Sequence, residues 1–201
     1  MEAYERYTQD IGGSPRGKST GAFFDFDGTI IASHSVMDMF IERLKSGEIK
    51  SQEIFDLGAM IPRYLLKQDN FTDSIAASIR NLAGVPEEKL LELGDRVARE
   101  RLGAEVFPEM RAMIRAHQKK GHTVAIVSSA TRYQVAPLAR SLGIEHIRCT
   151  ELEVVADHFT GEMDGEPCYA DNKVTAVRKF ARLHRVNIGK SFFYSNGAED
   201  V

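Results

Sequence analysis

The sequence predicts an α/β fold in which a core of parallel strands and helices is interrupted by a helical insertion. Three observations lead to this prediction. A short apolar run over residues 23–27 ends in two carboxylates, residues 35–101 show helical periodicity without a convincing strand, and from Pro108 onward helical patterns alternate with short apolar strands. Such alternation is the signature of a parallel sheet covered by helices. The helical stretch then forms an insertion in that core.

Length and composition fit one soluble domain with a modest insertion. The chain has 201 residues, of which 43% are hydrophobic and 27% charged, and its formal net charge is -3 at pH 7. Such a chain can bury a sizeable core, and its charge gives no broad reason to expect nucleic acid or an anionic membrane as a partner. The sequence shows neither a membrane span nor the apolar core of a signal peptide. We therefore expect a cytoplasmic protein.

Residues 1–20 predict a flexible leader, because they are polar and contain a Gly-Gly-Ser-Pro-Arg-Gly cluster. The same stretch holds Gly12, Gly17, Lys18 and Ser19 in the spacing G-x-x-x-x-G-K-[ST] of a phosphate-binding loop. That loop needs a strand before it and a helix after it, so that the helix N-terminus can receive the phosphates. Here an apolar strand follows instead. Nucleotide binding at this loop is therefore disfavoured and stays an alternative to test.

The first predicted strand ends in an acidic pair, Asp25 and Asp27, which is followed by Gly28 and Thr29. Residues i and i+2 of a strand lie on the same face, so the two carboxylates are expected to converge at the strand's carboxyl end. Two anionic groups held that close repel each other unless a cation, a proton or strong donors offset the repulsion. The pair suggests metal-assisted chemistry on a phosphate.

Four helices are expected between this strand and the rest of the core. Apolar side chains fall on one face over residues 36–44 and again over residues 54–66. A third helix is expected over residues 72–82 and a fourth over residues 86–102, with Pro86 at a first helical position. These four helices make up the insertion.

Beyond the insertion, helices and strands alternate to the end of the chain. Gly121 and Gly143 each follow a helical pattern and are expected to cap the C-terminus of that helix. The predicted elements are helices over 108–120, 131–142 and 171–184, a strand over 123–127, short strands with a turn over 146–163, and a last strand over 191–194. The strand over 123–127 is apolar throughout, which is typical of a strand covered on both faces.

Two polar positions fall where ligands bind in such a sheet, beyond the carboxyl ends of strands and at helix N-termini. Ser128 and Ser129 follow the strand over 123–127, and Ser128 is placed to donate to a phosphate oxygen, although either serine could simply begin the next helix. Lys173 lies near the start of a helix, where a cation opposes the helix dipole. An anion between Lys173 and Asp25 would explain this position; the alternative is a solvated surface lysine.

A second polar and acidic cluster follows the last strand, in the segment Asn196-Gly197-Ala198-Glu199-Asp200. Sites with few protein carboxylates suit Mg2+, because this ion keeps several waters and accepts substrate oxygens. Asp25, Asp27 and this segment could supply its protein ligands.

Together these features resemble the haloacid dehalogenase superfamily of phosphohydrolases. The resemblance is to subfamily IB, the branch that has a helical C1 cap after the first motif and includes phosphoserine phosphatases. The first motif, DxDGT, is Asp25-Phe26-Asp27-Gly28-Thr29, and the second, third and fourth motifs match Ser128, Lys173 and the segment from Asn196 to Asp200. The resemblance covers residues 22–201.

The resemblance implies a domain organisation and a mechanism. The core would be a Rossmann-like domain over 21–34 and 103–201, with the cap over 35–102. Asp25 would attack phosphorus to form an aspartyl-phosphate, and Asp27 would protonate the leaving oxygen and later deprotonate water.

The remaining implied roles concern binding of the substrate and of the metal. Ser128 and Lys173 would hold the phosphoryl oxygens, and Mg2+ would shield the charge between nucleophile and substrate. Its expected ligands come from Asp25, Asp27, Asn196 and Asp200. The expected substrate-binding residues are Gly28, Thr29, Ser129, His34 and Arg80. The cap would close over the site.

The sequence departs from the family in three places. The metal-binding aspartate of the fourth motif is Asn196 here, and an amide oxygen without formal charge should hold the metal more weakly. Phosphoserine phosphatases carry a glutamate for the substrate's ammonium and a cap arginine for its carboxylate, and the corresponding positions hold His34 and Ser78, with Arg80 two residues away. Buried unpaired charges cost a few kcal/mol each. We therefore expect a small phosphorylated metabolite other than phosphoserine.

The end of the sequence is the last departure. Family members continue past the fourth motif, whereas this sequence ends at Val201, so the C-terminal end of the core is expected to be truncated. Some relatives carry an acyltransferase domain downstream, which makes a fragment of a larger protein one interpretation. With Asn196, this supports a second hypothesis, in which the chain is a phosphate-binding or regulatory module with weak catalysis.

Overall fold

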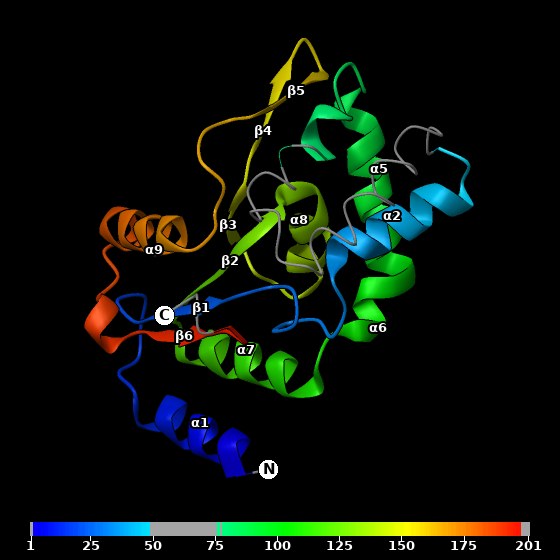
Figure 1. Ribbon diagram of the computed structural model, residues 1–201. Helices are drawn as coiled ribbons and strands as arrows, with labels where there is room; N and C mark the ends of the chain where they lie inside the picture. Colours follow the sequence, from blue (N-terminus) through cyan, green and yellow to red (C-terminus); the bar gives the residue numbers. More distant parts are fainter. Residues whose placement is uncertain (1, 49–75, 77, 198–201) are drawn as a thin grey trace.

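The computed structural model describes residues 2–48, 76 and 78–197, and its core is a four-stranded parallel sheet with helices on both faces (Figure 1). Along the sheet the strand order is β3-β2-β1-β6, and each neighbouring pair is parallel. These strands are β1 (Gly21–Phe24), β2 (Thr123–Thr131), β3 (His146–Thr150) and β6 (Phe192–Tyr194). A separate antiparallel hairpin is formed by β4 (Leu152–Val155) and β5 (His158–Met163). The predicted α/β fold with a parallel sheet is confirmed.

Successive residues of the central strands point to opposite faces of the sheet, and different helices cover each face. On one face, Phe23 and Val127 pack with Phe180 of the C-terminal helix. On the other, Phe24 and Ile126 belong to the larger apolar core. The covering helices are α7 (Pro108–Lys120), α8 (Arg132–Ser141) and α9 (Asp171–His184). Burial on both faces accounts for the continuous apolar composition of β1 and β2.

Several predicted elements of the core appear at the expected residues. The helices over 108–120 and 171–184 have the predicted bounds, and Gly121 ends α7 in the left-handed conformation with φ of 73°. Strand β2 continues to Thr131, four residues beyond the predicted end at Val127. Its pairing with β3 shifts register between Val127 and Thr131, and Thr131 pairs with Thr150. The irregular pairing explains why the sequence pattern of the polar residues after Val127 does not predict a strand.

The described part of the insertion begins with α2 (Ser35–Lys45) and ends with α5 (Glu87–Val97). Helix α5 runs on into a π-helical turn, Ala98–Leu102, and the short helix α6 (Gly103–Glu105). The fourth predicted helix therefore ends as an α-helix at Val97 and changes its hydrogen-bonding pattern beyond it. The expected helix over 54–66 lies outside the described residues. Of the expected helix over 72–82, residues 76 and 78–82 are described; residues 76 and 78–80 are helical, and residues 81 and 82 form a turn.

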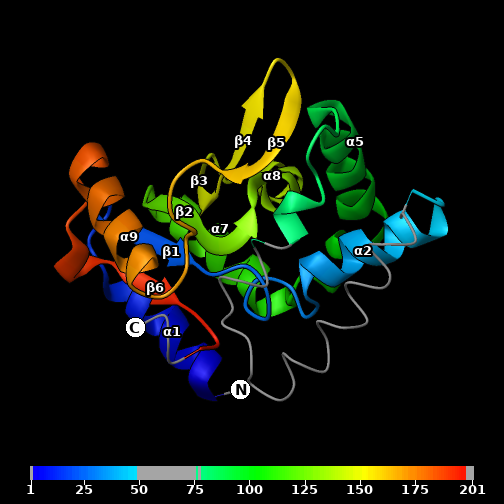
Figure 2. The ribbon, with the colours of Figure 1, turned by 45° about the horizontal axis from the view of Figure 1, so that its top comes forward.

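The hairpin β4-β5 connects the insertion to the core. Three main-chain hydrogen bonds make this contact: from Gly84 to Phe159 (N–O distance 2.8 Å), from Phe159 to Val85 (3.0 Å) and from Glu87 to Asp157 (2.9 Å). Figure 2 shows the hairpin next to the chain that leads into α5. The insertion is thus held by the hairpin as well as by its two covalent connections to the core.

The N-terminal residues form a helix, α1 (Glu2–Gly13), where the sequence predicted a flexible leader. The Nζ atom of Lys120, at the end of α7, donates to the carbonyl oxygens of Ile11 (2.9 Å), Gly12 (2.7 Å) and Ser14 (2.5 Å). A cation at this position satisfies the last carbonyls of the helix and complements its dipole. The leader prediction was wrong because composition does not reveal a capping group supplied by a helix distant in the sequence.

The segment over residues 12–19 does not have the surroundings of a phosphate-binding loop. The carbonyl oxygen of Lys18 accepts a hydrogen bond from the Thr123 hydroxyl (2.8 Å), and that of Ser19 accepts one from the N–H of Asn187 (2.7 Å). The chain then continues directly into β1. No helix N-terminus follows the segment, which is the feature that the loop requires.

A buried chain of hydrogen bonds joins α7, β6 and the N-terminal segment. His117 Nε2 lies 2.8 Å from the hydroxyl of Tyr194, His117 Nδ1 lies 2.7 Å from His122 Nδ1, and His122 Nε2 lies 2.8 Å from the carbonyl oxygen of Pro15. Burial lowers the pKa of both rings, that of His117 to about 3, so both are neutral near pH 7. Because the carbonyl of Pro15 can only accept, the single hydrogen of His122 is on Nε2; His122 Nδ1 then accepts from His117, whose Nε2 accepts from Tyr194.

Candidate active site

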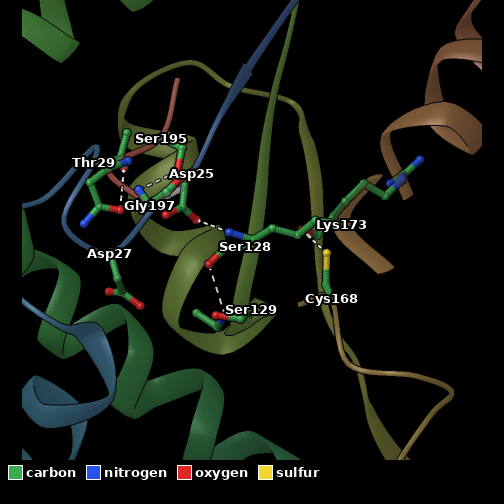
Figure 3. Close-up of polar contacts among 12 residues, drawn as sticks. Asp25, Asp27, Thr29, Ser128, Ser129, Cys168, Lys173, Ser195 and Gly197 are labelled. Carbon is green, nitrogen blue, oxygen red and sulfur yellow. Dashed lines mark hydrogen bonds and ion pairs between the residues drawn. The ribbon is translucent and has the colours of Figure 1, made fainter. Parts of the chain in front are cut away.

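The carboxyl ends of β1, β2 and β6 and the start of α9 bring four of the sequence-predicted site residues to one edge of the sheet (Figure 3). Asp25 follows β1, and its N–H donates to the carbonyl oxygen of Tyr194 in β6 (2.9 Å). Ser128 lies in the second half of β2, Asn196 follows β6, and Lys173 is in the first turn of α9. This is the ligand-binding edge expected of an open parallel sheet.

Asp25 and Lys173 form a buried ion pair. The distance between Lys173 Nζ and Asp25 Oδ1 is 2.9 Å, and the two residues are 4% and 7% exposed, Lys173 having the smaller value. Charges buried to this extent are stable only when they are paired. The alternative of a solvated surface lysine is therefore wrong, and the position of this cation at a helix N-terminus is explained by the carboxylate facing it.

The Asp27 carboxylate is turned toward the start of the insertion. Its Oδ1 accepts from the N–H of Ser35 (2.7 Å), and its Oδ2 accepts from the Ser35 hydroxyl (3.1 Å). Figure 3 shows it pointing away from the pair formed by Asp25 and Lys173. Burial raises the pKa of Asp27, the hydrogen bonds from Ser35 oppose the rise, and the charge of Asp25 adds to it. Asp25 and Asp27 both follow β1, but Asp25 pairs with Lys173 and Asp27 with Ser35.

Ser35 is held in turn by the core helix α8. Gln134 Nε2 lies 3.0 Å from the Ser35 hydroxyl oxygen, and Gln134 Oε1 accepts from both the N–H and the hydroxyl of Thr131 (2.8 Å each). Thr131 and Gln134 form a capping box at the start of α8. Sequence reasoning missed Ser35 and Gln134. The T-x-x-Q spacing was a signal for the capping box, but no local pattern connects it to Ser35.

Ser128 and Ser129 do not begin a helix, because the N-cap of α8 is Thr131. Ser128 is 1% exposed, and its hydroxyl oxygen accepts a hydrogen bond from the N–H of Ala130 (3.1 Å). The carbonyl oxygen of Ser129 accepts one from the Thr150 hydroxyl in β3 (2.7 Å). These bonds hold the second half of β2, and Figure 3 shows Ser128 on the side of Asp25 and Lys173.

Gly28 and Thr29 hold the side chain of Asn196. The Thr29 hydroxyl accepts from the N–H of Asn196 (3.1 Å) and donates to its Oδ1 (3.4 Å). Gly28 has φ of 70°, and a Cβ at this residue would overlap the Asn196 carboxamide nitrogen. Glycine is therefore required at position 28 both by the backbone conformation and by the close approach of Asn196.

Two of the predicted substrate-binding residues have different surroundings. The exposed His34 is the N-cap of α2, directly before Ser35, and its charge contributes to lowering the pKa of Asp27. Arg80 is exposed, and its main chain lies against Gly161 of the hairpin. Within the described residues, the structure places Arg80 at the contact between insertion and hairpin and shows no contact between its side chain and either aspartate. Asp200 lies outside the described residues.

The oxygen atoms at this edge of the sheet suit a hard cation. Asp25 offers carboxylate oxygens and Asn196 an amide oxygen, which are ligands that Mg2+ prefers, whereas both oxygens of the Asp27 carboxylate accept from Ser35. No cluster of three His, Cys, Asp or Glu side chains occurs among residues 2–48 and 78–197. The described oxygen donors are of the kind that Mg2+ binds, and one of them is the neutral amide of Asn196, which follows β6.

Comparison with known proteins identifies the class. Residues 22–201 match the family model of the haloacid dehalogenase-like hydrolases, and the chain belongs to this family. A probable phosphatase of Mycobacterium tuberculosis is 27% identical over 96% of this chain and 68% of its own length. Within the family, the chain is an enzyme of the phosphatase type.

Solved structures agree with the fold. A protein of unknown function from Bordetella pertussis superposes with a TM-score of 0.80 at 22% identity, covering 92% of this chain and 85% of its own. A phospho-aspartyl intermediate analogue of phosphoserine phosphatase gives a TM-score of 0.62 at 20% identity, covering 91% and 80% respectively. Among the residues that the structure describes, no helix is both long and apolar enough to cross a membrane.

Proposed function

We propose that the chain is a Mg2+-dependent phosphomonoesterase that acts through an aspartyl-phosphate on Asp25. The observation that carries this proposal is the buried ion pair between Asp25 and Lys173, next to a second carboxylate that is separately held. A carboxylate can act as a nucleophile toward phosphorus when positive charge offsets its repulsion by the phosphate. Lys173 supplies that charge in a site shielded from water.

In the first half-reaction, an oxygen of Asp25 attacks phosphorus and the bond from phosphorus to the leaving oxygen breaks. Asp27 gives its proton to the leaving oxygen, so that an alcohol departs and Asp27 becomes a carboxylate. The raised pKa of Asp27 supports the protonated form that this step needs. Ser128 and Lys173 hold the phosphoryl oxygens.

In the second half-reaction, Asp27 takes a proton from a water molecule as the water oxygen attacks phosphorus. The bond between phosphorus and Asp25 breaks, inorganic phosphate is released, and both aspartates return to their starting protonation states. Asp25 and Asn196 would hold Mg2+, which supplies charge neutralisation between the nucleophile and the phosphate. Thr29 and Gly28 orient the amide of Asn196.

The substrate that we propose is a small phosphorylated metabolite other than phosphoserine. A zwitterionic leaving group needs a partner for its ammonium and one for its carboxylate. At the position expected to receive the ammonium, this chain has the exposed His34, and Arg80 lies against the hairpin. Leaving either charge unpaired in a closed site costs a few kcal/mol, which favours an uncharged leaving group.

The test is turnover of 4-nitrophenyl phosphate with and without Mg2+. We expect Mg2+-dependent turnover, a loss of at least about 10³-fold in Asp25→Asn, and trapping of a beryllofluoride adduct at Asp25. Asp95→Asn is a matched control at an exposed aspartate that pairs with Arg140, and it should keep full activity. Absence of turnover together with no effect of Asp25→Asn would refute the proposal.

A second candidate is a phosphate-binding or regulatory module with weak catalysis, and Asn196 is the observation that favours it. A neutral ligand reduces the charge available to hold Mg2+. Calorimetric titration separates the candidates, because the enzyme should bind Mg2+ and form the beryllofluoride adduct, whereas the module should bind phosphate without either.

A further inference from the structure

We propose that Ser35 and Gln134 are positioning residues that hold the Asp27 carboxylate for proton transfer to the leaving group. Ser35 is the first residue of α2 in the insertion, and Gln134 lies in the first turn of the core helix α8. Both segments would therefore orient the side chain that donates the proton. The proposal rests on the proposed role of Asp27 as the proton donor. It concerns only Ser35 and Gln134 and assigns no new role to the nucleophile, Asp25.

The directions of the hydrogen bonds in this chain follow from one main-chain group. The N–H of Thr131 can only donate, so the atom of Gln134 that faces it is the oxygen, and the amide nitrogen therefore faces Ser35. The Ser35 hydroxyl accepts from that nitrogen, which leaves its single hydrogen for Asp27 Oδ2. The N–H of Thr131 therefore fixes which atom donates in every hydrogen bond from the capping box to the Asp27 carboxylate.

Both oxygens of Asp27 are held by the same residue. The N–H of Ser35 lies 2.7 Å from Oδ1 and its hydroxyl lies 3.1 Å from Oδ2, which fixes the plane of the carboxylate. Ser35 is fully buried and Gln134 is 7% exposed, so bulk water does not readily replace either partner. A misplacement of about 1 Å in a reacting group can cost about 10²-fold in rate. The orientation of Asp27 thus depends on Gln134, which does not contact it.

This role predicts a dependence on the leaving group. A poor leaving group needs a well-placed proton donor when the bond to phosphorus breaks, whereas a good one departs as an anion. The pair of probes is phenyl phosphate and 4-nitrophenyl phosphate, which share the aromatic ring and differ in the stability of the released phenolate. The ratio of their kcat/KM values reports how well Asp27 delivers its proton.

Gln134→Glu is the decisive variant. Glutamate keeps the oxygen that accepts from Thr131, and Glu at this position is itself a standard member of a capping box, so α8 should keep its stability. The change removes the nitrogen that donates to Ser35. The matched control is Gln118→Glu on α7, whose amide nitrogen donates to the carbonyl oxygens of Leu142 and Gly143 away from the site.

In Gln134→Glu we expect kcat/KM for phenyl phosphate to fall on the order of 10-fold further than that for 4-nitrophenyl phosphate, with an unchanged ratio in Gln118→Glu. An unchanged ratio in Gln134→Glu would show that Gln134 serves only to cap α8 and would overturn the proposal. If thermal unfolding shows that Gln134→Glu does not fold, Ser35→Ala decides by the same ratio. If the wild-type protein turns over neither probe, the proposed function itself fails.

Discussion

At the scale of single residues, Asn196 is where this site departs from its family. Its side chain is held in a defined orientation by the Thr29 hydroxyl and by the absence of a Cβ at Gly28. In the proposed function this amide oxygen is a ligand of Mg2+, and it supplies no negative charge. The affinity for a divalent cation depends on the number of charged ligands.

Asn196→Asp is expected to tighten Mg2+ binding on the order of 10-fold, which corresponds to about 1.4 kcal/mol. The added carboxylate would give the cation a second charged ligand in addition to Asp25. Isothermal titration calorimetry measures the change without reference to activity. Asn187→Asp, at an exposed asparagine outside the site, is the control and should bind Mg2+ as the wild-type protein does. Equal affinities in all three proteins would contradict the prediction.

The sequence located most of the main residues of the candidate site but not the residues that hold them. The proximity of Asp25 and Lys173 followed from the rule that parallel strands end at one edge. Ser35 and Gln134 were missed because their contact joins residues 99 positions apart and depends on side-chain orientation. The substrate-binding role expected of Arg80 stays a prediction, because the structure shows only that its side chain is exposed and its main chain lies against Gly161.

At the scale of elements, the close approach of α5 to α8 holds the insertion against the core. Gly94 of α5 faces the main chain of Tyr133 in α8, and a Cβ at Gly94 would overlap the Tyr133 carbonyl oxygen. A carbonyl oxygen belongs to the helix backbone and cannot turn aside as a flexible side chain can. The two helices can therefore meet at this distance only because position 94 is glycine.

Gly94→Ala is expected to destabilise the protein by about 1–3 kcal/mol, because overpacking forces the two helices apart. Urea unfolding measures the free-energy change. The matched control is Gly12→Ala in α1, where a Cβ meets no atom within 4 Å and the better helix propensity of alanine should stabilise by roughly 0.5–1 kcal/mol. A neutral or stabilising effect at position 94 would show that α5 does not depend on this contact.

Elements whose sequence signals lie within the element itself were predicted with the right bounds. Helices α7 and α9 have the predicted bounds, because apolar periodicity marks both and Gly121 also ends α7. Helix α1 was missed because the cation at its end comes from Lys120. The polar residues after Val127 continue β2 because β3 supplies a partner through a register shift. These failures have one cause, which is a contact made by a segment distant in the sequence.

At the scale of the whole molecule, the buried histidines connect three parts of the chain. His117 and His122 hydrogen-bond to each other, to Tyr194 of the edge strand and to the carbonyl of Pro15 in the N-terminal segment. Every donor and acceptor in this chain is used when both rings are neutral. A further proton on His117 would lie on Nε2 and face the hydroxyl hydrogen of Tyr194, without solvent to receive it.

The stability of the protein is expected to fall as the pH decreases from about 6.5 toward 3. The pKa of His117 is about 3 in the folded protein, against 6.5 for a solvated histidine, so between these values the unfolded chain binds more protons. Each pH unit in this window costs up to ~1.4 kcal/mol, and the contribution is constant above it. Urea unfolding at pH 7.5, 5.5 and 4.5 measures the slope.

His117→Gln should make this slope shallower, because the group that titrates in the unfolded chain has been removed. His158→Gln, at an exposed histidine of the hairpin, should leave the slope as in the wild-type protein. Equal slopes in all three proteins would assign the pH dependence to other groups.

The pairing of the hairpin with the insertion has a consequence for exchanging parts between relatives. The insertion lies between β1 and β2 in the sequence and the hairpin between β3 and α9, yet main-chain hydrogen bonds at Gly84, Val85 and Glu87 join them. Main-chain bonds of this kind depend on the spacing of the two backbones more than on side-chain identity. A chimera that receives a new cap over 35–102 should therefore keep this junction with the native hairpin over 152–163 when the new cap presents its backbone at the same spacing.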